Sequence, residues 1–112
     1  MTTSYVRLRR IISGGQTGVD RAALDVALET GLPCGGWVPS GRRTEDGPLH
    51  KRYPLKETPT RRYAERTLWN VRDSDATLLI TWGPLTGGTA LTRDYAETLE
   101  RPFFITDLLQ PP

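Results

Sequence analysis

The chain has 112 residues, of which 37% are hydrophobic and 25% charged, so we expect one globular domain spanning residues 1–112 and no wholesale disorder. One Cys and one His exclude an internal disulfide and a clustered zinc site. No apolar run reaches the ~20 residues of a membrane-spanning helix. Arg residues come before any apolar stretch, so no secretory signal is visible and we expect a cytoplasmic protein.

Apolar periodicity predicts alternating strands and helices. The expected strands are residues 6–12, 34–38, 76–82 and 102–106, and the expected helices are residues 20–30, 61–71 and 89–99. Residues 39–59 form a long polar loop, a length typical of functional or disordered segments. The strand at 76–82 is apolar on both faces, which predicts a central position. This alternation predicts an α/β fold, with a mostly parallel sheet of about four to five strands flanked by helices.

Arginine dominates the basic residues. Thirteen of the 15 are Arg, whose planar guanidinium suits phosphate or another oxyanion. A GC-rich genome would produce the same bias, so both explanations stay open. The net charge of +2 is too small to indicate a nucleic-acid partner.

The first strand and the first helix are joined by a glycine-rich turn, SGGQTG at residues 13–18, followed by Asp20 and Arg21. Glycines let backbone N–H groups approach a ligand, and the start of a helix favours negative charge. The turn lacks the Gly-Lys-Ser/Thr of a Walker A loop and is not a strict GxGxxG. A tight turn capped by Asp20 is the structural alternative. The candidate anion- or nucleotide-binding residues here are Gly14, Gly15, Gln16, Thr17, Gly18 and Arg21.

A second glycine-rich turn follows the strand at 76–82 and precedes the last helix. Both turns should lie at the carboxyl edge of a parallel sheet, where ligands bind, so we expect them to meet at one ligand. Two unrelated loops are the alternative. The candidate donors are Thr86, Gly87, Gly88 and Thr89.

The long loop supplies further candidates. Arg42 or Arg43 could clamp an oxyanion, and Glu45 or Asp46 could bind a metal, a hydroxyl or a ring nitrogen. Composition alone favours the alternative, a solvated loop with local ion pairs. In the following helix, Arg66 and Asn70 are four residues apart and can share a face.

Several of these motifs resemble one known group. Residues 12–25 (ISGGQTGVDRAALD), 35–39 (GGWVP) and 41–47 (GRRTEDG) are similar to the molybdenum cofactor carrier proteins, as are further motifs at residues 53–57, 66–77 and 83–89. These carriers belong to the Rossmann-like superfamily that includes the LOG, DprA-type and YpsA proteins. The similarity spans roughly residues 11 to 105.

The resemblance implies a single Rossmann-like domain that forms homo-oligomers, dimers or tetramers. It implies a carrier that holds molybdenum cofactor (molybdopterin, a phosphorylated pterin dithiolene) or molybdate without turning it over, with molybdoenzymes as further partners. The glycine turns and Arg42 would then meet the ligand's phosphate and oxo groups, and Glu45 and Asp46 would shape the pocket. No catalytic residue and no protein ligand to a metal is assigned.

Two departures from the family pattern matter. Family members usually continue to another strand, so this chain is expected to be short at its C-terminus, with part of the sheet or pocket missing or supplied by a neighbouring subunit. LOG-type hydrolases carry a Glu shortly after a Gly-Gly-x-Gly-Thr motif, where this chain has Thr92. Thr92 cannot do acid–base work, which disfavours a nucleotide hydrolase.

The sequence therefore favours a non-enzymatic binding protein over an enzyme. The alternative is a nucleotide-ligand sensor or an N-glycosidic hydrolase, with Glu45 or Asp46 as acid or base. Carboxylates facing the glycine turns would favour that alternative, and a pocket lined only by donors would favour the carrier. Single-stranded DNA binding by a basic and aromatic patch at residues 61–69 is a third possibility.

Overall fold

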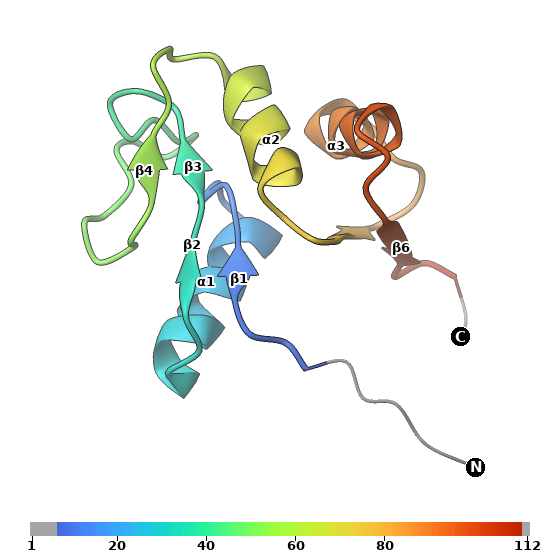
Figure 1. Cartoon of the computed structure of the whole chain (residues 1–112), viewed down its shortest axis with the longest axis horizontal. Helices are drawn as coiled ribbons and strands as arrows, with labels where there is room; N and C mark the ends of the chain where they lie inside the picture. The colour runs from blue at the N-terminus through green and yellow to red at the C-terminus, as the bar shows by residue number, and fades with distance from the viewer. Residues whose placement is uncertain (1–6, 111–112) are drawn as a thin grey trace.

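The structure is a computed structural model that describes residues 7–110. Three helices alternate with short parallel strands (Figure 1). The elements in chain order are β1 (Ile11–Ile12), α1 (Val19–Thr30), β2 (Cys34–Gly35), β3 (Trp37–Val38), β4 (Lys56–Glu57), α2 (Tyr63–Arg72), β5 (Thr77–Thr81), α3 (Gly87–Thr98) and β6 (Phe103–Asp107). The α/β class and the order of the predicted elements are confirmed; Val6, the first residue of the predicted first strand, lies outside the described residues.

β2 and β3 are one extended segment that changes partner at Gly36. The carbonyls of Pro33 and Gly35 accept hydrogen bonds from the β1 side, whereas those of Gly36 and Val38 accept from the β4 side. Carbonyls of successive strand residues point in opposite directions, so β1 and β4 lie on opposite sides of this segment. All three pairs, β1–β2, β3–β4 and β5–β6, are parallel.

The prediction that residues 76–82 form a central strand is wrong for the described part of the chain. β5 pairs with β6 alone, in a ladder that places Thr77 opposite Phe103 and Leu78 opposite Phe104. Leu78 is 61% exposed because no helix covers its face, whereas Leu79 on the other face is buried. The parallel arrangement is compatible with a Rossmann-like fold, but it forms three pairs in place of one sheet of four to five strands.

The buried core lies between α1, the β2–β3 segment and the loop before β4. Its members are apolar side chains from all three parts: Leu24, Val38, Leu49, Tyr53 and Leu55. The segment predicted as a polar loop, residues 39–59, therefore supplies three core residues and also contains β4. Because the segment is mostly polar and charged, the sequence did not indicate that Leu49, Tyr53 and Leu55 fold back onto α1 and join the core.

Gly36 lets the first glycine turn pack closely against the strand. A Cβ at this position would lie 2.1 Å from the Ser13 carbonyl oxygen, and the backbone φ is 138°. The neighbouring Trp37 is bonded to α2 through Asn70, whose Oδ1 accepts the Trp37 N–H at 2.8 Å and whose amide donates to the Trp37 carbonyl at 3.1 Å. The turn after β1 is thus held against β3 and α2. Across residues 7–110, no helix has the length and apolarity needed to cross a membrane.

Candidate functional site

The first glycine turn leads from β1 directly into α1. Gly18 precedes the helix at φ 84° and provides no side-chain cap, so Asp20 is not the N-cap. Ser13 instead donates its hydroxyl to the Asp20 carbonyl at 2.7 Å, which ties the start of the turn to the first turn of the helix. The first N–H groups of a helix have no partner within it and carry partial positive charge. Here the Arg21 N–H donates to the Gln16 carbonyl at 3.1 Å, which leaves the N–H groups of Val19 and Asp20 available to an acceptor from elsewhere.

Gln16 is buried beneath the turn and connects it to the long loop. Its amide nitrogen donates to the carbonyls of Gly14 at 3.3 Å and Arg43 at 3.1 Å. Its Oε1 is buried and has no hydrogen-bond partner within the described chain. An unpaired buried acceptor is costly and uncommon, so this oxygen marks a position for an additional donor.

Glu45 supplies an acceptor to the turn at Thr17, two residues before α1 begins. Its carboxylate accepts the Thr17 N–H at 2.9 Å and the Thr17 hydroxyl at 2.8 Å. Burial acts to raise the pKa of Glu45, but these two bonds outweigh it and hold the pKa below its ordinary value. A carboxylate of the chain itself therefore occupies the position at which the sequence predicts an external anion.

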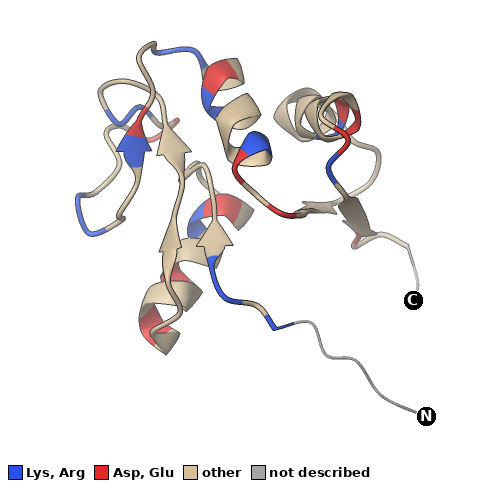
Figure 2. Cartoon of the chain, viewed as in Figure 1, with Lys and Arg blue, Asp and Glu red and all other residues tan. Residues whose placement is uncertain are grey.

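Asp46 fastens the same loop to α1. Arg21 donates from Nη1 and Nη2 to the two Asp46 oxygens at 2.6 and 2.9 Å and also binds the Gly15 carbonyl at 3.1 Å. The Arg21 side chain lowers the pKa of Asp46 well below its ordinary range, with Thr44 assisting. We call residues 44–47 the acidic strap, because both of its carboxylates are bound across the start of α1. Figure 2 shows acidic and basic segments next to each other on α1.

Arg66 reaches the first turn from α2. Its side chain is 15% exposed, and its Nη1 lies 3.4 Å from the Asp20 carboxylate, a long ion pair. Its Nε is buried without a partner. A Cβ on Gly14 would lie 2.1 Å from Nη1, so the guanidinium packs against the turn where only glycine leaves room.

Burial affects both members of this pair. It raises the pKa of the Asp20 carboxyl, an effect that the charge of Arg66 opposes. It also lowers the pKa of Arg66, with Asp20 and Glu45 acting against that shift. Arg66 was absent from the residues predicted to bind the ligand, although its position one helical turn before Asn70 placed it on the face that meets the strand. Arg66 packs against Gly14, which is distant in the sequence, so no local sequence pattern indicated this contact.

Arg42, a predicted oxyanion clamp, is directed elsewhere. Its guanidinium donates to four backbone carbonyls at 2.8–3.0 Å, those of Leu49, His50, Tyr53 and Leu55. Arg42 thus closes the loop that carries the acidic strap and the core residues. In the described structure Arg42 holds the loop that carries the acidic strap in place. The arginines that contact the first turn are Arg21 and Arg66.

The second glycine turn opens α3, as predicted. Thr86 precedes the helix, and its carbonyl accepts hydrogen bonds from the N–H groups of Thr89 and Ala90. The side chains of Thr86 and Thr89 make no hydrogen bond within the described chain. Gly87 and Gly88 are exposed. Across residues 7–110, no hydrogen bond or ion pair links this turn to the first. The meeting of the two turns at one ligand stays a prediction.

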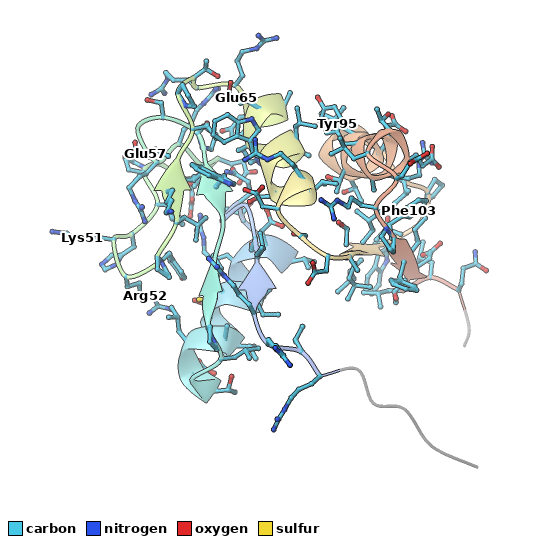
Figure 3. All side chains as sticks on the ribbon, viewed as in Figure 1. Lys51, Arg52, Glu57, Glu65, Tyr95 and Phe103 are labelled. Carbon is cyan, nitrogen blue, oxygen red and sulfur yellow. The ribbon has the colours of Figure 1, made fainter. Side chains whose placement is uncertain are left out.

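Space for a ligand lies beside the acidic strap. A hollow of about 210 Å³ is lined by Gly41, Arg43, Thr44, Gly47, Pro48 and Arg61. Figure 3 shows the side chains of this loop and of the start of α2 crowded together above β3 and β4. No group of three or more His, Cys, Asp or Glu side chains in residues 7–110 could hold a metal ion.

Two comparisons with known proteins found a match to this chain. Residues 11–112 match the model of the circularly permutated YpsA SLOG family. The crystal structure of "Putative molybdenum carrier protein" from Syntrophus aciditrophicus SB is similar, with 52% sequence identity and a TM-score of 0.89. That match covers 90% of this chain and 64% of the other, so this chain spans less than two thirds of its relative's length. No curated protein matches.

Proposed function

This chain belongs to the circularly permutated YpsA SLOG family, and we propose that it binds and carries a small oxyanionic ligand containing molybdenum at the turn between β1 and α1. The ligand is molybdate or the molybdenum cofactor, molybdopterin. The relative's name supports the metal, and the donor set at the turn supports the oxyanion. The role is carriage, with no chemical step.

The observation that carries this proposal is the state of Arg66. Its guanidinium is mostly buried, makes one long hydrogen bond, to Asp20, lies 5.8 Å from the centre of the Tyr63 ring and leaves Nε without a partner among the described residues. A buried cation is destabilising unless it is paired and hydrogen-bonded. Phosphate and molybdate oxygens are acceptors that satisfy a guanidinium with two parallel bonds. Arg66 therefore has both the charge and the free donors to bind such a group beside Gly14.

The turn supplies the remaining donors. The Thr17 N–H and hydroxyl now bind Glu45, and a ligand oxyanion would replace that carboxylate, with Gly18 and the helix dipole adding favourable charge. The unpaired Gln16 oxygen would accept an N–H of a pterin ring. Thr86, Gly87, Gly88 and Thr89 would bind a second anionic group only if the two turns meet. The bound cofactor would supply a molybdenum centre for later use in an acceptor enzyme.

The proposal also covers the oligomeric state, the cellular location and the protein partners. We propose a homo-oligomer, a dimer or tetramer, that acts in the cytoplasm and passes its ligand to molybdoenzymes. The name of the relative supports the small ligand alone. Nucleic acid is not a proposed partner.

Native mass spectrometry of the purified protein with parallel molybdenum analysis tests the proposal. It predicts a molybdenum-containing adduct of pterin or molybdate mass that disappears in the Arg66→Gln variant. An adduct of nucleotide mass without molybdenum would contradict the carrier. If the purified protein is empty, titration with molybdate, and with phosphate for comparison, decides whether the turn binds oxyanions.

A second function is favoured by one observation. The carboxylates of Glu45 and Asp20 lie at the first turn, the feature expected of a nucleotide N-glycosidic hydrolase. Burial raises the pKa of Asp20, which suits a general acid. In that reaction the bond between C1′ and the base breaks, a water oxygen bonds to C1′, and the base leaves with a proton. Release of free base from nucleoside monophosphates, abolished by Glu45→Gln, would establish this function in place of the carrier.

A further inference from the structure

Two arginines line the hollow beside the acidic strap, and the residues around them supply no opposite charge. We call this hollow the arginine hollow; its lining residues are Gly41, Arg43, Thr44, Gly47, Pro48 and Arg61. Its walls come from the loop that follows β3 and from the segment that leads into α2, on the side of the molecule away from β6 (Figure 1). No Asp or Glu is among these lining residues, so the charge at the hollow is positive.

Arg43 is held in place as one wall of the arginine hollow. Its guanidinium carbon lies 4.4 Å from the centre of the Tyr63 ring, and its Nη1 donates to the Arg61 carbonyl at 2.8 Å. Stacking on an aromatic ring orients a guanidinium without using its N–H donors. A guanidinium has five such donors, and no other described residue accepts a hydrogen bond from those of Arg43. The remaining donors are therefore available to a ligand.

Arg61 lines the same hollow from the segment before α2. Its side chain is exposed and makes no hydrogen bond or ion pair with another described residue. A Cβ on Gly41 would lie 2.9 Å from the Arg61 Nη1, and the φ of Gly41 is 80°, a value that glycine adopts without strain. Glycine at position 41 therefore leaves room for the guanidinium to approach the loop.

The carboxylates of the surrounding segments have partners of their own. Glu57 accepts two backbone N–H groups of the loop at 2.6 and 3.2 Å, and Glu65 accepts a backbone N–H at 3.0 Å; both are labelled in Figure 3. Asp46 is bound to Arg21 at 2.6 Å. Among the described residues, none of these carboxylates forms an ion pair with either arginine of the hollow.

We propose that the arginine hollow binds a phosphate monoester group, held between Arg43 and Arg61. A guanidinium binds phosphate oxygens through two parallel hydrogen bonds. A phosphate monoester carries a charge of about −1.5 to −2 at pH 7, which two arginines balance and a single carboxylate does not. The hollow of about 210 Å³ is several times the ~30 Å³ that one water occupies, so it has room for a phosphate group.

The arginine hollow adjoins the turn between β1 and α1. The Tyr63 ring that Arg43 contacts also lies 5.8 Å from the guanidinium carbon of Arg66, and Gln16 of the turn donates to the Arg43 carbonyl at 3.1 Å. One ligand can therefore place an oxyanion at Arg66 and a phosphate at Arg43. This inference rests on the proposed function and narrows its ligand to one that carries a phosphate as well as the molybdenum oxyanion, as molybdopterin does and molybdate does not.

An NMR titration of the full chain with inorganic phosphate at low ionic strength tests the arginine hollow. The backbone amide signals of Gly41 and Gly47 report on the hollow, and that of Gly18 reports on the first turn. We expect the hollow signals to shift with a dissociation constant of about 1–10 mM, since a small ion bound by two exposed cations binds weakly. Absence of a shift at Gly41 and Gly47 up to about 50 mM phosphate, well above that range, would overturn the inference.

Variants of the two arginines identify the donors. Arg43→Gln and Arg61→Gln should each raise the dissociation constant for phosphate at least about fivefold, because each removes a charged donor. Arg62→Gln, at the exposed arginine next to Arg61 that does not line the hollow, is the matched control and should titrate like the wild type. Circular dichroism checks the fold, and Arg61→Gln remains a valid test if Arg43→Gln does not fold. Unchanged affinity in the folded variants would overturn the inference.

Titration of the wild type with molybdate, read at Gly18, separates this inference from the proposed function. Phosphate binding at the hollow without molybdate binding at the turn would support the hollow and refute the carrier. Molybdate binding at the turn without a phosphate response at the hollow would support the carrier and overturn the inference about the hollow.

Discussion

Glu45 competes with any anion that binds at the start of α1. Its carboxylate accepts two bonds from Thr17, at 2.9 and 2.8 Å, and all these atoms are exposed to solvent. A charge-assisted bond is worth about 1.5–3 kcal/mol when protected from water, and solvent screening reduces this to about 0.5–1 kcal/mol here. Removing the charge in Glu45→Gln should therefore lower the cost of displacement by about 1 kcal/mol, or roughly five- to tenfold in affinity.

Isothermal titration calorimetry with molybdate at low ionic strength measures this effect. Glu29→Gln is the matched control, because Glu29 is an exposed carboxylate at the other end of the same helix. We expect tighter binding for Glu45→Gln and little change for Glu29→Gln. Weaker binding by Glu45→Gln would refute the reasoning, since it would mean that Glu45 contacts the ligand as a partner, as the hydrolase mechanism requires.

The other predictions concern the scaffold. Arg42→Ala removes four bonds to carbonyls and should destabilise the fold by about 2–4 kcal/mol in urea unfolding, whereas Arg62→Ala, at an exposed residue, should change it by less than about 0.5 kcal/mol. Gly36→Ala puts a methyl group 2.1 Å from a backbone oxygen and should cost about 3 kcal/mol or more, while Gly88→Ala, where a Cβ meets nothing within 4 Å, should be neutral or stabilising in thermal melts. Asp46→Asn should lower the melting temperature slightly at pH 6; because the pKa of Asp46 is depressed, the wild type loses its contribution as pH falls below about 3.8, and the two proteins should converge in acid. A melting difference that stays constant from pH 6 down through the acid range would show that the charge of Asp46 does not contribute to stability.

The sequence predicted those parts of the fold that depend on local signals. Helix spacing and the Gly31 that ends α1 located all three helices to within two residues at each end. The first turn was predicted to bind an anion because its glycines lie between a strand and the start of a helix, and ligand binding there stays a prediction. The parallel pairing followed from the alternation of strands and helices.

Features that depend on distant contacts escaped prediction. β4 is two residues long and polar, and it is a strand only because β3 lies beside it. The partners of the Arg42 guanidinium are backbone carbonyls of residues 49–55, and no sequence-spacing rule predicts how that segment folds back. Arg66 meets Gly14 across 52 positions of the sequence, from 14 to 66, so its role in the site became visible only in the folded chain.

The partners of the two carboxylates in the acidic strap also could not be predicted from the sequence. The sequence offered Glu45 and Asp46 as two equivalent carboxylates. The structure separates them: Asp46 is bound to Arg21, and Glu45 occupies the acceptor position at Thr17. The different partners of the two carboxylates therefore follow from geometry and not from residue type.

Binding of molybdate to the wild type and to Arg66→Gln tests the central claim most directly. Arg62→Gln, an exposed arginine directly before the same helix, is the control, and thermal melts verify that each variant is folded. We predict that Arg66→Gln weakens binding at least about 30-fold, because a buried charged hydrogen-bonding group is lost, while the control binds like the wild type. Equal affinity of the folded Arg66→Gln variant and the wild type would contradict the account.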